Sequence, residues 1–412
     1  ELTIPGNDQV SRIMMSAMKK AYQRNHMTKS DEIFSKWYGR DQIQKKISRN
    51  VTEAFFIRLL KNENIFRAFE KLYAYRMIKQ LSAKTVRKTN EIKPIGALST
   101  VFVSNWEWPL FKFLQKINIP TATHILSFDN LTSRGYLPLN GFDQYYVWQD
   151  NMAQELTHFY KIPSQRICIT GTPQFDFHID KRFNWGRKKT AEYLGIDPGK
   201  PYIAYCANSY KHTPGEAELI EHLIKSIEET GTYENLQWVI RIHPLDKYQR
   251  WVDLFDNQPN VVISHPWDRE DKTNFWAVPS DDEIALLGNT LRHAAVTVTI
   301  ASTVALDSCV VDTPVICVGF HPDKSSKENK YYHDVHFTHH YEPITNSGAV
   351  AFVRNRVEFM KALTSAFDNP EERQIQRKAL MAKICGQVDG NAAERIAENF
   401  INLLQLKNQA DN

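Results

Sequence analysis

The stretch that most constrains the fold is residues 294–320, which read AAVTVTIASTVALDSCVVDTPVICVGF. Residues 296–300 are uncharged and largely β-branched, which predicts a strand buried on both faces of a parallel sheet. Apolar residues within 304–310 then recur at helical spacing, and Pro314 opens a second apolar strand. The pattern predicts a strand, a tight turn, a helix and a strand, which is the repeating unit of an α/β sheet.

The turn of this unit, Ala301-Ser302-Thr303, presents two hydroxyls and free backbone N–H groups at the start of a helix. Such a helix start binds phosphate well, because the unpaired N–H groups and the helix dipole favour an anion. Asp307 lies one turn inside the helix, where a carboxylate can reach a ribose. A plainer interpretation stays open, in which Ser302 only caps the helix and Asp307 only faces solvent.

Length and composition limit the classes of protein to consider. The 412 residues suffice for two domains, and no apolar run approaches the roughly 18 residues of a membrane span. Five cysteines without C-x-x-C spacing favour a reducing cytoplasm over a zinc or disulfide framework. Neither a Gly-rich Lys-Ser/Thr phosphate loop nor a G-x-G-x-x-G motif is present. We expect no cofactor and no nucleic-acid partner.

Charge is distributed unevenly along the chain. Residues 1–95 contain 20 Lys or Arg and 9 Asp or Glu, whereas the whole chain has a formal net charge of only +4. A basic first quarter suits an anionic membrane surface, a lipid phosphate or a polyanionic acceptor. Solvated helix faces explain the same charges without a partner. We expect a cytoplasmic protein that also binds peripherally to the inner face of the membrane.

The elements form two successive series. Residues 9–82 predict helices, and strands then alternate with helices up to residue 170. Residues 174–187 break the pattern before a second alternating series, and a polar loop at 321–343 precedes three final helices. We predict an α/β chain with two doubly wound, Rossmann-like sheets. Its parts are a basic helical part at 1–95, an acceptor domain with a hinge at 96–187, a donor domain at 188–370 and C-terminal helices at 371–412.

Polar residues follow the strands of the second series where each strand ends. They are Asn208 and Ser209, His243 before Pro244, His265 before Pro266, and Ser302 and Thr303. Because the carboxyl ends of parallel strands share one edge of a sheet, ligands bind there. A histidine that ends a buried strand can donate to a nucleotide phosphate, although it can equally satisfy a structural bond. We predict that these six residues bind a donor.

At these residues the sequence resembles the GT-B superfamily of nucleotide-sugar glycosyltransferases. It is most similar to the bacterial surface-polysaccharide branch, which includes CDP-glycerol glycerophosphotransferases and CMP-sugar transferases. The matching segments are VIRIHP at 239–244, IASTVALD at 300–307 and TGTPQFD at 170–176. The resemblance implies two domains facing a cleft and no required metal. It also implies that His243 with the paired hydroxyls binds the donor phosphates and that the aspartate at 307 holds the ribose.

One departure affects the catalytic residue. The glycerophosphotransferases resemble one another in a first-domain His-Gly motif, whereas residues 127–130 here read Ser-Phe-Asp-Asn. A positioned aspartate can accept the proton of an attacking hydroxyl, so Asp129 is our candidate general base. Asn130 and Arg134 are candidate acceptor contacts. An Asx turn explains Asp129 without any catalytic role.

Other polar residues are weaker candidates. Glu107 and Asp150 are possible bases, but each also suits a helix start. Residues 333–340 contain four histidines and Asp334, at a spacing that can place two imidazoles together. This segment has no second carboxylate at a fixed spacing, and we expect no metal site.

The leading prediction is a transferase that moves a sugar from a CMP-, CDP-, UDP- or GDP-activated donor to a surface polysaccharide or lipid-linked glycan, with Asp129 as base. Three alternatives stay open: a CDP-glycerol-type glycerophosphotransferase, a nucleotide-sugar 2-epimerase and a nonenzymatic polyanion-binding protein. The epimerase needs acid and base carboxylates but no acceptor site.

Overall fold

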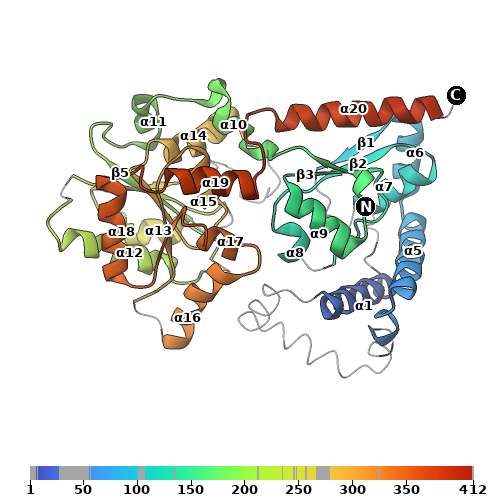
Figure 1. Cartoon of the computed structure of the whole chain (residues 1–412), viewed down its shortest axis with the longest axis horizontal. Helices are drawn as coiled ribbons and strands as arrows, with labels where there is room; N and C mark the ends of the chain where they lie inside the picture. The colour runs from blue at the N-terminus through green and yellow to red at the C-terminus, as the bar shows by residue number, and fades with distance from the viewer. Residues whose placement is uncertain are drawn as a thin grey trace. The chain divides into compact units, whose positions relative to one another are not determined.

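The structure is a computed structural model of the chain. It describes residues 6, 8–26, 55, 57–100, 107–133, 136–210, 213–233, 235–244, 246, 248–255, 258–265, 279–322 and 325–410. The chain divides into two compact units (Figure 1). Unit 1 comprises Glu1–Thr172, Ile384–Gln387 and Asn391–Asn412, and unit 2 comprises Pro173–Lys383 and Val388–Gly390.

Unit 1 contains a four-stranded parallel sheet in the order β1-β2-β3-β4. Its elements are α1 (Gln9–Asn25), α5 (Glu63–Lys79), α6 (Ala83–Ile92), β1 (Ala97–Ser99), α7 (Trp108–Lys116), β2 (Thr121–His124), α8 (Asn130–Ser133), β3 (Gln144–Val147), α9 (Asp150–Tyr160), β4 (Ile167–Ile169) and α20 (Ala392–Ala410). Ile396 and Leu403 of α20 pack on Ala122 of β2 and Tyr146 of β3. The last helix therefore completes the core of the first sheet.

This return of the chain corrects the predicted range 371–412. The helix α19 (Gln374–Ile384) belongs almost entirely to unit 2, whereas α20 belongs to unit 1. The physical reason is the apolar stripe of α20, which covers β2 and β3. Amphipathic periodicity predicts such a helix but does not identify the sheet that it covers.

The predicted hinge at 174–187 also belongs to unit 2 rather than to the first domain. The helix α14 (Asp281–Arg292) holds this segment. The backbone N–H of Trp185 donates to Asn289 Oδ1 over 2.9 Å, and Arg292 Nη2 donates to the His178 carbonyl over 2.5 Å. These bonds join residues more than a hundred positions apart, so local sequence patterns do not show them.

Unit 2 contains a six-stranded parallel sheet in the order β10-β9-β8-β5-β6-β7. Its further elements are α10 (Asp176–Ile179), α11 (Arg187–Leu194), β5 (Tyr202–Cys206), α12 (Glu216–Glu228), β6 (Gln237–Arg241), α13 (Tyr248–Phe255), β7 (Val261–Ser264), β8 (Val296–Thr299), α15 (Val304–Val310), β9 (Val315–Val318), α16 (Ser326–Asp334), α17 (Glu342–Thr345), β10 (Ala351–Val353) and α18 (Arg356–Asp368).

Both faces of this sheet are covered, which explains its apolar strands. On one face Ile203, Ile240 and Val298 pack into a core that also contains residues of α12, α13 and α18. On the opposite face Ala204 and Val239 pack into a core with residues of α11 and α14. Strands buried on both faces read as nearly continuous apolar runs, as predicted for the stretch around β8.

Two features of unit 2 differ from the sequence predictions. Strand β10 was not predicted, and the supposed polar loop at 321–343 contains α16. This helix is polar along most of its length, but its Tyr332 is buried and donates its hydroxyl to the Pro214 carbonyl over 3.0 Å. One buried aromatic is too weak a periodic signal to predict a helix.

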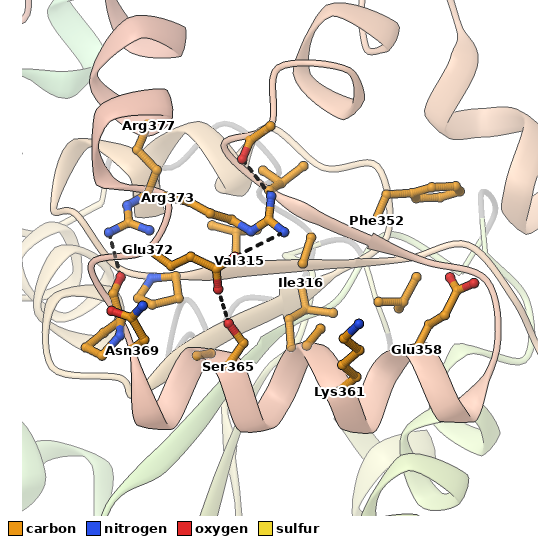
Figure 2. A pocket seen from close by; sticks show the side chains of 18 of the residues that line it. Val315, Ile316, Phe352, Glu358, Lys361, Ser365, Asn369, Glu372, Arg373 and Arg377 are labelled. Carbon is orange, nitrogen blue, oxygen red and sulfur yellow. Dashed lines mark hydrogen bonds and ion pairs between the residues drawn. The ribbon is translucent and has the colours of Figure 1, made fainter.

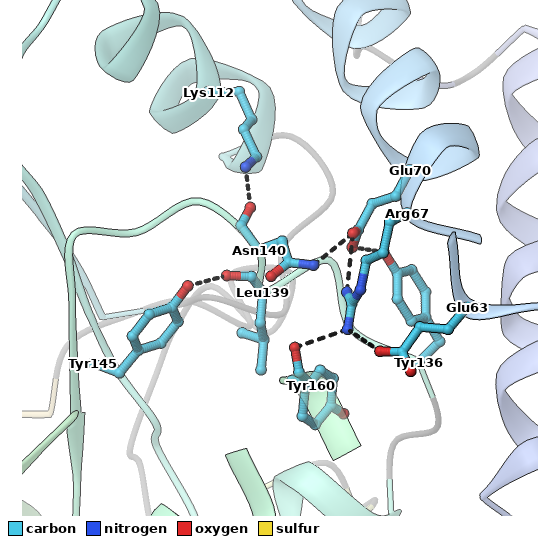
Figure 3. Close-up of polar contacts among 9 residues, drawn as sticks. All are labelled: Glu63, Arg67, Glu70, Lys112, Tyr136, Leu139, Asn140, Tyr145 and Tyr160. Atoms are coloured by element: carbon cyan, nitrogen blue, oxygen red, sulfur yellow. Dashed lines mark hydrogen bonds and ion pairs between the residues drawn. The ribbon is translucent and has the colours of Figure 1, made fainter. Parts of the chain in front are cut away.

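A buried polar network ties the loop between α8 and β3 to the helix α5 (Figure 3). The carboxylate of Glu70 accepts hydrogen bonds from the Tyr136 hydroxyl, from Asn140 Nδ2 at 2.5 Å and from Arg67 Nη1 at 3.1 Å. The basic N-terminal part thus contributes to the core of unit 1.

Within the described ranges, no helix is long and apolar enough to cross a membrane.

Candidate functional site

The predicted donor residues of unit 2 follow strands that are neighbours in the sheet. Ser302 follows β8, Asn208 follows β5 and His243 follows β6, and these three strands are adjacent and parallel. Asn208 Nδ2 donates to the Ile300 carbonyl, so two of the strand ends are joined directly. Neighbouring strands lie about 4.8 Å apart, which places these residues along one short edge.

The turn after β8 has an unusual backbone. Ala301 has a φ of 35°, a value that residues with a Cβ rarely adopt. The N-cap of α15 is Thr303, which is exposed and makes no capping bond with its side chain in the described structure. The interpretation of Ser302 as the N-cap is therefore wrong. A helix start without a side-chain cap suits an anion from outside the chain.

The loop after β5 depends on a buried carboxylate that the sequence interpretation missed. Glu216 is fully buried and accepts hydrogen bonds from the Tyr205 hydroxyl at 2.9 Å, the Thr213 hydroxyl at 2.6 Å and the Asn208 N–H at 3.0 Å. Burial raises the pKa of Glu216 to about 7. In the sequence this residue looks like any acidic residue of a first helical turn. Its role is to hold the Asn208 segment beside β8.

A second missed residue, Arg241, ends β6. Its side chain is 9% exposed, and Nη1 lies 3.5 Å from Ser264 Oγ. Burial lowers the pKa of Arg241, since it disfavours the charged guanidinium. A cation at the carboxyl edge of the sheet attracts an anionic ligand. The available signal was a charged residue inside the otherwise apolar run at 238–242.

The two histidines at strand ends differ in position. The His243 carbonyl accepts the Asp246 N–H at 2.8 Å, which forms the turn into α13. The His265 ring instead lies edge-on to Tyr248, with centroids 5.7 Å apart. It follows β7, the edge strand, which is three strands and therefore about 14 Å from β8. The structure places His243 next to the Asn208 strand and His265 farther along the sheet.

Asp307 does not simply face solvent, as the plainer interpretation had it. Its Oδ1 lies 2.9 Å from His178 Nε2, and the exposed fractions of the two side chains are 15% and 0%. His178 belongs to the segment that was predicted as a hinge. Its aromatic neighbours in the sequence gave no indication of this pairing.

In unit 1, Asp129 directly precedes the short helix α8. Its Oδ1 accepts hydrogen bonds from Ser127 Oγ at 2.5 Å and from Asn130 Nδ2 at 3.3 Å. The Asn130 side chain therefore orients Asp129. Arg134 lies outside the described residues, and its predicted acceptor contact stays a prediction.

Glu155 of α9 was not predicted as a site residue. Its Oε2 is buried and has no hydrogen-bond partner among the described residues. Burial, followed by repulsion from Asp129, raises the pKa of Glu155 to about 8. Two carboxyl groups whose charges repel can divide acid and base roles, because one of them keeps its proton.

The strand before Asp129 also contains a histidine that the sequence interpretation passed over. Strand β2 ends at His124, three residues before the Ser-Phe-Asp-Asn segment at 127–130. This side chain is buried, its Nε2 has no partner within the described ranges, and burial lowers its pKa to about 4. The sequence comparison with the His-Gly motif used residues 127–130, whereas the histidine of this region lies three residues earlier, at the end of β2.

The weaker base candidates, Glu107 and Asp150, differ in their surroundings. Glu107 Oε2 accepts the Ser99 hydroxyl at 3.0 Å, and half-burial raises the pKa of Glu107. Asp150 is the first residue of α9, whereas the N-cap is Gln149. Asp150 therefore does not cap this helix.

The histidines at 333–340 do not converge. His336 is buried and its Nε2 lies 3.0 Å from the Val318 carbonyl, while the His333 ring stacks on Phe337 with centroids 4.8 Å apart. Among the described residues, no group of three His, Cys, Asp or Glu side chains is arranged to hold a metal ion.

Unit 2 also has a hollow of about 550 Å³ between β9, β10, α18 and α19 (Figure 2). Val315 and Ile316 form part of its wall, and Arg373, which donates to the Gly348 carbonyl at 2.8 Å, lies at its side. Val315 is the first residue of β9. The hollow therefore reaches the amino end of this strand, whereas the predicted donor residues follow the carboxyl ends.

Comparisons with solved structures show the fold. A UDP-GlcNAc 2-epimerase from Neisseria meningitidis, bound to UDP-GlcNAc, has 15% identity and a TM-score of 0.51, covering 81% of this chain and 82% of that chain. The S. aureus MnaA–UDP structure has 14% identity and a TM-score of 0.51, covering 83% and 87%. The wall teichoic acid polymerase TagF aligns at 12% identity and a TM-score of 0.46, covering 85% and 100%. The prediction of a GT-B-like α/β fold with two parallel sheets is confirmed.

The sequence comparisons identify the family. A search of curated proteins finds no match. A family model described as CDP-Glycerol:Poly(glycerophosphate) glycerophosphotransferase matches residues 137–402, well over half of the chain. This range contains every predicted donor residue and the whole sheet of unit 2. The chain belongs to the CDP-glycerol:poly(glycerophosphate) glycerophosphotransferase family.

Proposed function

We propose that the protein transfers a glycerophosphate group from CDP-glycerol to a poly(glycerophosphate) acceptor of the cell envelope. The family match over residues 137–402 is the observation that carries this proposal. It favours the glycerophosphotransferase alternative over the sugar transfer that led the sequence predictions. The similarity to the epimerase structures, at 14–15% identity, is evidence for the fold only.

The two transfers differ in the bond that breaks. In glycerophosphate transfer, an acceptor hydroxyl oxygen attacks the phosphorus that bears the glycerol. A new P–O bond forms, the bridging P–O bond of the diphosphate breaks, and CMP leaves with the bridging oxygen. The acceptor proton must pass to a base. The protein's contribution is to orient the reactants and to stabilise the phosphoryl charge.

Unit 2 offers suitable groups for the diphosphate. The start of α15 after Ser302 has no side-chain cap in the described structure, and Arg241 provides a buried positive charge at the same edge of the sheet. His243 follows the strand of Arg241 and can donate a ring N–H. Hydrogen bonds from such groups to phosphate are charge-assisted and therefore strong.

Unit 1 offers the base. Asp129 has its carboxylate oriented by Ser127 and Asn130, and Glu155 holds a proton at neutral pH beside it. The Asp129 carboxylate takes the proton of the acceptor hydroxyl in one step. We expect the protonated Glu155 to limit the negative charge around that reaction.

The products test this proposal. The purified protein is incubated with CDP-glycerol, with and without a poly(glycerophosphate) acceptor, and released nucleotide is identified by chromatography. We expect CMP only when the acceptor is present, together with a longer polymer. Isomerised UDP-GlcNAc in a parallel reaction favours the epimerase alternative. Acceptor-dependent nucleotide release from a nucleotide-sugar, with none from CDP-glycerol, overturns the proposal in favour of sugar transfer.

Matched variants test the donor site. His243→Ala and Ser302→Ala are expected to weaken CDP-glycerol binding at least tenfold, because each removes a group that we place against phosphate. His265→Ala is the comparison variant, and we expect a smaller loss of affinity from it than from His243→Ala, since His265 follows the edge strand. Unchanged affinity in both test variants contradicts the donor assignment, whatever the products are.

A further inference from the structure

We propose that His178 is a positioning residue that holds Asp307 for contact with the ribose of the donor nucleotide. The inference rests on the proposed donor site and adds a residue to it from the segment that precedes the second sheet. Both residues belong to unit 2. The distance between His178 Nε2 and Asp307 Oδ1 is 2.9 Å.

The surroundings of the imidazole define which nitrogen carries the proton. His178 Nδ1 is buried and has no hydrogen-bond partner among the residues that the structure describes. A carboxylate oxygen only accepts hydrogen bonds, so the nitrogen that faces Asp307 must carry a proton to bond with it. The favoured tautomer therefore has its proton on Nε2, from which it donates to Asp307.

A ring contact, a hydrogen bond to the backbone and the close approach of a helix hold His178 in this position. The Phe177 ring lies 4.0 Å from the imidazole, centroid to centroid, and Arg292 Nη2 donates to the His178 carbonyl at 2.5 Å. On the side of α14, a Cβ added at Gly288 would lie 3.3 Å from His178 Nδ1 and 3.1 Å from a Phe177 ring carbon. The helix thus approaches the histidine closely, and Gly288 is the residue that permits this approach.

The pairing leaves Asp307 able to bind a ligand. The hydrogen bond engages Oδ1, and the side chain remains 15% exposed, so Oδ2 is available to accept a hydroxyl. Asp307 lies one helical turn after Thr303, at the start of α15. A nucleotide with its phosphates at that helix start places its ribose within reach of the same helix. His178 restricts the carboxylate to one orientation, which lowers the entropy cost of binding.

The test compares nucleotides that differ only in the ribose. Binding of CDP and of 2′,3′-dideoxy-CDP is measured by calorimetry for the wild type, His178→Leu and His178→Gln. A charge-assisted hydroxyl contact gives the wild type about a tenfold preference for CDP. His178→Leu keeps most of the side-chain volume but cannot donate, and we expect this preference to fall to about twofold. Glutamine has an amide N–H close to the position of the histidine Nε2, so His178→Gln should keep most of the preference for CDP.

A purely structural histidine predicts a different result. If the histidine is purely structural, its replacement weakens the binding of CDP and of dideoxy-CDP equally. The preference for CDP then stays intact, and this result would overturn the proposal. Gly288→Ala is a second variant, because it retains the histidine and only displaces it. Its preference for CDP should lie between those of the wild type and His178→Leu. Circular dichroism and melting without nucleotide verify that each variant is folded.

Asp307→Ala separates this inference from the donor site itself. If Asp307→Ala keeps the wild-type preference for CDP, the ribose assignment fails and the proposed donor site with it. If Asp307→Ala loses the preference while His178→Leu keeps it, the donor site stands and only the positioning role is overturned. Loss in both variants, with no further loss in the double variant, supports His178 and Asp307 acting as one unit.

Discussion

Replacing Glu155 by glutamine should make the protein more stable at neutral and alkaline pH. The wild-type carboxyl has a buried oxygen without a partner among the described residues, and the charge of Asp129 acts on it. Both effects favour the protonated form, which glutamine imitates in shape and in the absence of charge. The variant removes the cost of ionising this position without creating a cavity.

The magnitude follows from the pKa difference between the folded and unfolded states. Folding raises the pKa of Glu155 from 4.5 to about 8. The stabilising contribution of the protonated group is therefore complete below pH 4.5 and is lost as the pH rises through about 8. At about 1.4 kcal/mol for each pH unit, the total loss is about 5 kcal/mol, of which about 3 kcal/mol is lost by pH 7.

The assay is urea unfolding of the wild type and Glu155→Gln between pH 4.5 and pH 9. We expect equal unfolding free energies near pH 4.5 and a widening difference above it, with the variant more stable by a few kcal/mol at pH 8. Asp150→Asn is the control, because it removes an exposed carboxylate from the same helix. Parallel curves for the wild type and Glu155→Gln across this range would refute the reasoning.

Three further predictions concern the site and its supports. Asp129→Asn should lower the rate of transfer by about a hundred- to ten-thousandfold while CDP-glycerol still binds, since an amide accepts protons poorly. If the variant turns over at a near wild-type rate, the base is another residue, and Glu107 is the next residue to change. Glu216→Ala should cost about 3 kcal/mol in unfolding free energy, because two buried hydroxyls and one partly buried backbone N–H lose their acceptor. Glu216→Gln should cost less. Equal denaturation midpoints for the wild type and Glu216→Ala would contradict this. Leu72→Ser with Tyr75→Ser should weaken flotation with anionic vesicles, since these residues are 56% and 52% exposed beside lysines of α5. Unchanged flotation would show that these two side chains do not contribute to membrane binding.

The sequence was sufficient for the fold because burial on both faces leaves a strong signal. The strand predicted at 296–300 is β8 (Val296–Thr299), and the strand predicted after Pro314 is β9 (Val315–Val318), since each is an apolar run next to turn residues. Strand β10 was missed because it has only three residues and lies at the edge of the sheet. Short edge strands have neither the length nor the composition of central ones.

Candidate residues that end strands were also predictable, because the topology of a parallel sheet determines where they meet. Ser302, Asn208 and His243 were found in this way, and the structure places them after adjacent strands. The boundaries were less certain. The sequence comparison centred on residues 127–130 and passed over His124, a buried histidine that ends β2 in the first sheet.

The residues that support the site were not predictable, for a physical reason that His178 and Glu216 illustrate. A catalytic or binding side chain has a position in its own element, but its hydrogen-bond partner is selected by packing between elements. His178 and Asp307 are 129 residues apart, and Arg292 and Gly288 of α14 determine how close they come. Such a partner leaves no spacing in the sequence. The partner is simply a polar residue, and its burial is known only once the helices are packed. The supporting groups therefore required the structure, whereas the strand-end groups did not.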